Sequence, residues 1–229
     1  MTLHVVLPTG DGKQLAWVTD KSAVFGRGNT SGIRKVEYLE KQKVACSSWG
    51  DFVGADVVDR FAKRCEAGAV DPSDARAVTS SIKDVGQEVL GEIPKDERAQ
   101  RYRAEKEQGH GVIVATFYDP LRLYLAFIGR NTICREVTEE IIAGDFYNPA
   151  RIFPYYYFPL TSKTLTDAIC VGVHSIRLAN KLRSEIVGDP VVWVYDGDKF
   201  RQMDSIELGT YTKASISLDS MILDKLGHR

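Results

Sequence analysis

The chain has 229 residues, enough to fill one hydrophobic core, so we expect a single domain over residues 1–229. A content of 44% hydrophobic and 27% charged residues is typical of a soluble globular protein. The formal net charge of −1 argues against a nucleic-acid-binding surface and against binding to an anionic membrane.

Neither a membrane span nor an export signal is visible in the sequence. No apolar run approaches the roughly 20 residues that a membrane helix needs, and the first residues lack a signal-peptide pattern. The cysteines are widely scattered and no pair has CxxC spacing, which indicates reduced thiols: Cys46, Cys65, Cys134 and Cys170. We therefore expect a cytoplasmic protein.

The chain opens with a predicted β-hairpin. Residues 3–7 and 14–18 are rich in strand-forming side chains and flank a Pro-Thr-Gly-Asp-Gly turn. Thr2 precedes the first of these strands, and Asp20 follows the second.

Two further strand patterns complete the first fifty-one residues. A glycine-rich loop follows the hairpin (Gly26, Gly28, Gly32), and strand patterns then occupy residues 34–39 and 44–46. Lys35 lies at the edge of the first of them. A turn of small residues at 47–51 closes this opening segment.

Two consecutive helices are predicted next. Asp51 can cap a helix whose apolar side chains recur at helical spacing from Val53 onward, and Gly68 would end it. A second helix begins at 71–74, with Pro72 in the first turn, where its missing N–H costs nothing.

Residues 92–107 are the most highly charged segment of the chain. They carry five acidic and five basic side chains and few apolar ones. This mixture is typical of a solvated helix end or a connector, which we favour; a docking loop for a partner is the alternative.

Strand patterns return in the second half, at residues 112–117, 121–127 and 133–137, with residues 140–144 as an extension of the same meander. The segment 148–159 is aromatic and punctuated by prolines. It can line a substrate groove or form a core or subunit-contact patch, and we favour the patch.

A long helix capped by residues 164–167 is predicted over residues 165–183, and His174 within it is expected to be structural. A hairpin over 191–203 and an amphipathic helix over 217–226 end the chain. The order of strands, two helices, strands, helix, hairpin and helix suits an α+β fold: a four-layer αββα sandwich of two mainly antiparallel sheets.

This order, together with Thr2, Asp20, Lys35 and the small residues around Ser47, resembles the proteasome-type N-terminal-nucleophile (Ntn) hydrolases. It is similar to proteasome beta subunits and to the peptidase subunit of the bacterial ATP-dependent protease. The resemblance covers nearly the whole chain. It implies a threonine-type peptidase that cleaves peptides or unfolded proteins, assembled as a homo-oligomeric ring, with an ATPase as a possible partner.

The resemblance also assigns roles to the four residues. Thr2, exposed by removal of the initiator methionine, is the nucleophile, and its own α-amine is the base. Asp20 and Lys35 are charged supports, and a backbone N–H near Ser47 stabilises the oxyanion. No cofactor is required.

Three positions depart from the family pattern. Ser47 stands where the family usually has glycine, and Ser184 and Val187 stand where proteasomes place an Asp and a Ser near the amine. Two alternatives therefore stay open: a non-catalytic proteasome-like subunit, and a small-molecule amidase of the same fold. The four histidines and four cysteines show no metal-binding spacing, so we expect no metal site.

Overall fold

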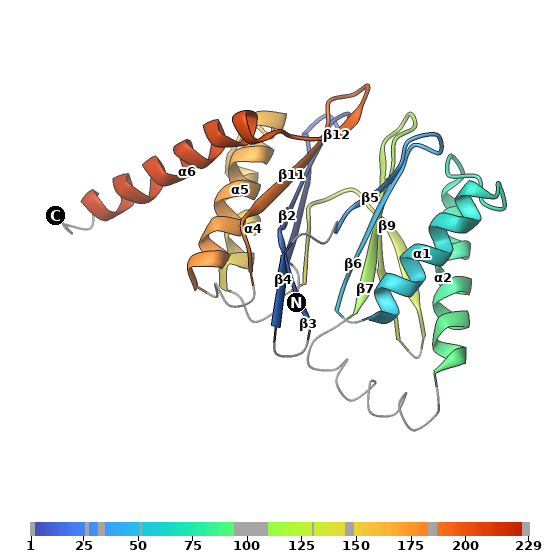
Figure 1. Cartoon of the computed structure of the whole chain (residues 1–229). Coiled ribbons are helices and arrows are strands. Elements are labelled where there is room, and N and C mark those ends of the chain that lie inside the picture. The colour runs from blue at the N-terminus through green and yellow to red at the C-terminus, as the bar shows by residue number, and fades with distance from the viewer. Residues whose placement is uncertain are drawn as a thin grey trace. The chain divides into compact units, whose positions relative to one another are not determined.

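The computed structural model describes residues 3–25, 28–31, 35–50, 52–93, 110–129, 131–144, 149–182 and 187–225. These residues belong to two compact units (Figure 1). Unit 1 is formed mainly by Ile33–Glu139, and unit 2 by Leu3–Gly32 with Tyr147–Arg229. The expectation of a single domain stays a prediction.

The sheet of unit 2 contains the predicted N-terminal hairpin at its centre. Its strand order is β10–β1–β2–β11–β12, with bounds Ile141–Gly144 (β10), Leu3–Pro8 (β1), Leu15–Asp20 (β2), Pro190–Tyr195 (β11) and Phe200–Gln202 (β12). Val5 lies opposite Val18, and Val18 lies opposite Val192 in the next strand. Both predicted hairpins of this sheet are thus confirmed.

A separate two-stranded hairpin follows the central strand. It consists of β3 (Ser22–Phe25) and β4 (Gly28–Ser31), paired antiparallel. The sequence had predicted a glycine-rich loop here. That prediction is wrong for Gly28, which begins β4; Gly26 and Gly32 lie outside the described residues.

Helix α5 (Leu165–Leu182) covers the sheet of unit 2 and contacts β1, β2 and β11. A Cβ atom at Gly172 would lie 2.5 Å from Cγ2 of Val18, so this glycine permits the close approach of helix and strand. The helix begins with the predicted cap: Thr164 Oγ1 accepts the N–H of Asp167 (3.2 Å), and Asp167 accepts the N–H of Thr164 (3.0 Å).

Shorter helical elements and a long terminal helix pack on α5. They are η1 (Pro149–Arg151), α4 (Ile152–Tyr157), η2 (Phe158–Leu160) and α6 (Ser205–Lys225). Helix α6 leaves the end of β12, passes α5 and continues to the end of the described chain (Figure 1). In the aromatic segment, Phe158 is buried in the core, whereas Tyr155, Tyr156 and Tyr157 are exposed, so the subunit-contact patch stays a prediction.

Unit 1 is an antiparallel meander covered by two helices. Its strands pair in chain order: β5 (Glu37–Leu39), β6 (Val44–Trp49), β7 (Gly111–Thr116), β8 (Arg122–Phe127) and β9 (Ile133–Val137). Helix α1 (Phe52–Glu66) contacts β6 and β7, and helix α2 (Ala75–Glu92) contacts β8 and β9. Their apolar faces enclose one core that includes Val57, Phe61 and Ile82.

Three predicted boundaries are wrong. Residues 140–144 do not extend the meander of unit 1; β10 pairs with β1 in the other sheet. Helix α2 begins at Ala75 after the cap Asp74, whose side chain accepts the N–H of Arg76 (2.8 Å), so Pro72 precedes the helix. The terminal helix begins at Ser205, twelve residues before its predicted start.

The described helices include none that is both long and apolar enough to cross a membrane.

Candidate functional site

Asp20 is the last residue of β2 and is fully buried within unit 2. One carboxylate oxygen accepts the backbone N–H of Leu3 (2.9 Å), and the other accepts the N–H of Gly188 (3.3 Å). A buried carboxylate needs such donors, because it loses its bonds to water. Asp20 therefore links the start of β1 to the segment that follows α5.

The register of β1 and β2 explains this position. His4 lies opposite Thr19, so Leu3 comes next to Asp20, and the Thr19 hydroxyl donates to the Leu3 carbonyl oxygen (3.1 Å). The carboxylate thus bonds the residue that directly follows Thr2. Thr2 itself lies outside the described residues.

Lys35 and Ser47 lie together in unit 1. The Ser47 hydroxyl donates to the backbone carbonyl oxygen of Lys35, and Ser47 is buried. Lys35 lies two residues before β5, and its Nζ atom is shielded from solvent. The contact fixes the backbone at Lys35 against β6.

The predicted turn around Ser47 is wrong in its position. Ser47 lies inside β6, opposite Ile113 in β7, and the strand continues to Trp49. The chain turns at Gly50, which has a positive φ of 98°. A Cβ atom there would lie 2.1 Å from Nδ1 of His110, so only glycine fits.

The segment after α5 contains the two positions where proteasomes place an Asp and a Ser near the N-terminal amine. Ser184 lies outside the described residues. Val187 is buried, and its carbonyl oxygen accepts from the Asn180 side chain (2.6 Å). The next residue, Gly188, supplies the N–H that bonds Asp20, so backbone groups contact the carboxylate here.

The cysteines offer no ready nucleophile. All four thiols are free, and burial raises the pKa of each: well above its usual value for Cys46, to about 12 for Cys65 and Cys134, and upward for the half-buried Cys170. A raised pKa keeps the thiol protonated at neutral pH and therefore unreactive. Within the described part of the chain, no three His, Cys, Asp or Glu side chains are placed to hold a metal ion.

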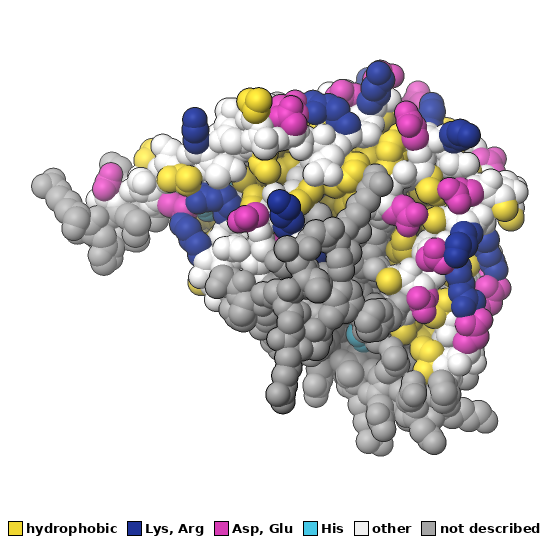
Figure 2. All heavy atoms as spheres, in the orientation of Figure 1, with side chains coloured by type: hydrophobic (Ala, Val, Ile, Leu, Met, Phe, Trp, Pro, Cys, Tyr) yellow, Lys and Arg dark blue, Asp and Glu magenta, His cyan; other side chains and the backbone are white. Residues whose placement is uncertain are grey.

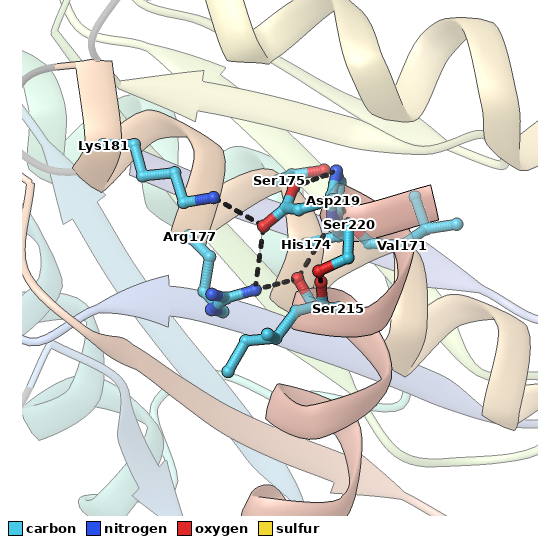
Figure 3. Close-up of polar contacts among 9 residues, drawn as sticks. Val171, His174, Ser175, Arg177, Lys181, Ser215, Asp219 and Ser220 are labelled. Atoms are coloured by element: carbon cyan, nitrogen blue, oxygen red, sulfur yellow. Dashed lines mark hydrogen bonds and ion pairs between the residues drawn. The ribbon is translucent and has the colours of Figure 1, made fainter. Parts of the chain in front are cut away.

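A polar cluster between α5 and α6 was not predicted from the sequence (Figure 3). It joins three residues of α5 to two of α6: His174, Arg177, Lys181, Ser215 and Asp219. His174 Nδ1 lies 2.9 Å from Ser215 Oγ, and Arg177 donates to the same oxygen. The spacings of three, four and seven residues place each set on one helix face, a signal that is visible once the two helices are known to pack.

Asp219 is the shared anion of this cluster. Its Oδ2 atom lies 2.5 Å from Lys181 Nζ and 3.6 Å from Arg177 Nη1, and its Oδ1 atom lies 4.0 Å from His174 Nε2. Since arginine only donates, Ser215 Oγ accepts from Arg177, and the tautomer of His174 sets whether this hydroxyl donates to Nδ1 or accepts from it. Burial lowers the pKa of His174, and the opposing effect of Asp219 is smaller. The ring is therefore neutral at pH 7.

Comparison with known proteins gives no match by sequence. No family model matches the chain, and no curated protein does. Solved structures that are similar in fold include two of Anbu. One is an Anbu (Gly-1) mutant from Hyphomicrobium sp. strain MC1, with a TM-score of 0.70 and 11% identity over 100% of this chain and 98% of that one.

The second solved structure is Anbu (ancestral beta-subunit) from Yersinia bercovieri. It has a TM-score of 0.68 and 12% identity over 99% of this chain and 97% of that one. These likenesses show the fold: the chain has the proteasome-like fold, and the predicted α+β sandwich of two mainly antiparallel sheets is confirmed.

Proposed function

We propose that this chain is a proteasome-like N-terminal threonine hydrolase that cleaves peptide bonds in peptides or unfolded proteins. Thr2 is the nucleophile and supplies the base through its α-amine, Asp20 and Lys35 are the charged supports, and a backbone N–H at Ser47 stabilises the oxyanion. The mechanism needs no cofactor. The fold similarity supports this mechanism, because the family that the sequence resembles combines the proteasome-like fold with an N-terminal nucleophile.

The observation that carries the proposal is the bond from the Leu3 N–H to the buried carboxylate of Asp20. A carboxylate without water is costly, and here it is held at the residue next to the proposed nucleophile. The chain thus holds the Asp20 side chain at the start of β1, bonded to the residue that follows the proposed nucleophile.

Lys35 adds a second supporting observation within unit 1. Its backbone is fixed by the Ser47 hydroxyl, and its Nζ atom is removed from solvent. A cation in a site without water stabilises a forming alkoxide more strongly than one in water does.

Self-assembly is the second part of the proposal. One structure of similar fold is described as a beta-subunit, which supports the assembly of this chain with copies of itself. An ATPase that delivers unfolded protein is a further proposed partner.

The decisive experiment measures the N-terminus and the hydrolysis together. Intact mass of the purified protein is expected to show loss of Met1. Thr2→Ala is expected to lower hydrolysis of denatured casein or short fluorogenic peptides by about 10³-fold or more, whereas Thr2→Ser keeps measurable activity. Retention of Met1 in active protein, or full activity in Thr2→Ala, would disprove the mechanism.

A non-catalytic proteasome-like subunit is the second candidate function. Asp20 favours it, because both carboxylate oxygens already accept backbone N–H groups, which is a sufficient structural reason for the residue. In that case the protein with a free Thr2 hydrolyses none of the peptides, and Thr2→Ala matches the wild type in every property.

A further inference from the structure

Charged side chains of both signs lie on the outer surface of α1 and α2. Figure 2 shows Lys and Arg interspersed with Asp and Glu at the right of the view. Several of them pair, among them Lys63 with Asp59 (2.7 Å) and Arg64 with Glu88 (2.6 Å). Exposed pairs of this kind are weak, because water screens both charges. A stronger restraint on the proposed site comes from inside unit 2, where a series of hydrogen bonds leads from α5 to β1.

One peptide group connects α5 to Asp20. The carbonyl oxygen of Val187 accepts a hydrogen bond from Nδ2 of Asn180, which lies near the end of α5 (2.6 Å). The N–H of Gly188 donates to Oδ2 of Asp20 (3.3 Å). This carbonyl and this N–H belong to the same planar peptide group, in which they point in opposite directions. Asn180 therefore restrains the direction of the N–H that reaches Asp20.

The chain on both sides of this peptide group is also held. Val187 is fully buried in the core of unit 2. The carbonyl oxygen of Asp189 accepts the N–H of Lys21 (2.8 Å), and Pro190 lies opposite Asp20 where β11 pairs with β2. These contacts set where the peptide group lies. The bond from Asn180 sets how the plane of the group is turned about its two Cα atoms.

Asp20 extends the series to the first strand. Its Oδ1 atom accepts the N–H of Leu3 (2.9 Å), so one side chain contacts both the segment after α5 and the start of β1. A peptide group that accepts at its carbonyl is polarised and donates more strongly at its N–H. The bond from Asn180 thus strengthens the next bond of the series as well as directing it.

We propose that Asn180 is a positioning residue for the reaction at Thr2, acting through the peptide group of Val187 and Gly188 and through Asp20. This inference rests on the proposed function, because it requires hydrolysis by Thr2. Without the bond from Asn180, the Gly188 N–H turns away, the Asp20 side chain is free to rotate, and the start of β1 moves. Nucleophilic attack depends on placement of the hydroxyl to within about 1 Å, so the loss appears in kcat. Asn180 acts through backbone groups and not on the substrate, so KM stays the same.

Three substitutions at position 180 separate the hydrogen-bond donor from the shape and the charge of the side chain. Asn180→Leu keeps the approximate shape without a donor, and Asn180→Asp keeps the shape but only accepts at neutral pH. For both we expect kcat on a fluorogenic peptide to fall by about ten-fold or more, with KM within about two-fold of the wild type. Asn180→Gln retains an NH₂ donor and is expected to recover much of the lost kcat. Circular dichroism checks the folding of each variant.

Hydrogen exchange tests the same contact without hydrolysis. In Asn180→Leu we expect the amide hydrogen of Gly188 to exchange about ten-fold or more faster than in the wild type, measured by mass spectrometry of overlapping peptides. Gln14→Ala is the matched control. Gln14 is also half-buried, and its Nε2 atom donates to the carbonyl oxygen of Asp196 (2.8 Å) at the opposite end of β2. This control is expected to change neither kcat nor the exchange of Gly188.

The outcomes separate this inference from the proposed function. Asn180 is not a positioning residue if Gly188 exchange is unchanged in Asn180→Leu, or if the losses lie in KM and not in kcat. The same conclusion follows if Asn180→Gln is no more active than Asn180→Leu, or if all three variants hydrolyse like the wild type. In each of these cases the Thr2 mechanism stands as long as Thr2→Ala is inactive. A wild type with a free Thr2 that hydrolyses nothing overturns both.

Discussion

Asp20 has a structural role and also a proposed chemical role. Its carboxylate accepts from two backbone donors in a fully buried position. Asp20→Asn replaces one acceptor oxygen with an NH₂ group and leaves one donor without a partner, so we expect the free energy of unfolding to fall by about 1–3 kcal/mol. Urea unfolding measures this loss.

Asp56→Asn is the matched control, because Asp56 is exposed on α1, and its stability is expected to stay within about 0.5 kcal/mol of the wild type. If Asp20→Asn were as stable as this control, the carboxylate would not be the anchor of β1. A loss of hydrolysis without a loss of stability would instead assign Asp20 to the chemistry alone.

His174 makes stability depend on pH. Burial lowers the pKa of His174 in the folded protein, so the unfolded state binds the proton more readily. The stabilisation is complete above the unfolded pKa of about 6.5 and is lost as pH falls below it. Asp219, which faces the ring, reduces this loss, while Arg177 and Lys181 add to it.

We expect His174→Gln to remove this part of the pH dependence. The difference in unfolding free energy between pH 7.5 and pH 5 should be smaller in the variant than in the wild type. Urea titrations at the two pH values provide the measurement. An equal difference in both proteins would show that the ring does not titrate as its burial requires.

The sequence predicts the Asp20 position but not its contacts. A carboxylate at the end of a strand is visible from the pattern of residues 15–20, and the hairpin register then places it beside Leu3. Gly188 is 168 residues away, and no local pattern connects the two. The same holds for Lys35 and Ser47: both predicted segments contain a strand, but β5 begins at Glu37, two residues after Lys35, and the turn after β6 was placed too early.

Among the elements, the misplaced strand and the misplaced helix start have different causes. Strand β10 follows β9 in the chain, and sequential strands commonly pair, yet β10 pairs with β1. The sheet that β10 joins is set by its contacts with β1, and the hydrophobic periodicity of the sequence does not reveal these contacts. The start of α6 was detectable: Asp204 accepts the N–H groups of Ile206 and Glu207, and Glu207 accepts the N–H of Asp204, a capping box.

Helix α5 provides a prediction at this scale. Gly172 allows the helix to contact β2, because a Cβ atom there would lie 2.5 Å from Val18 Cγ2. Gly172→Val forces the helix or the strand to shift, and we expect a loss of about 1–3 kcal/mol in thermal or urea unfolding.

Gly91, near the end of α2, is the matched control for this substitution. A Cβ atom there meets nothing within 4 Å, so Gly91→Val should be close to neutral. Equal effects at the two positions would mean that helix propensity, and not the contact with Val18, determines the result.

At the scale of the whole molecule, the chain links the two units several times. Unit 2 takes its sheet from both ends of the sequence, and unit 1 lies mainly between them. Neither unit is one continuous segment, so unfolding one removes the chain constraints on the other. We therefore expect one cooperative thermal transition, as for a single domain.

The three tryptophans report on the units separately. Trp17 and Trp193 lie in the sheet of unit 2, Trp49 lies in that of unit 1, and all three are buried. In Trp49→Phe the fluorescence follows unit 2, and in Trp17→Phe/Trp193→Phe it follows unit 1.

In each variant we expect the fluorescence midpoint to equal the midpoint from far-ultraviolet circular dichroism, which reports on both units. Because each variant is compared with itself, any stability change from the substitution cancels. Midpoints that separate in opposite directions in the two variants would establish two independently unfolding domains, and the single-domain prediction would be wrong.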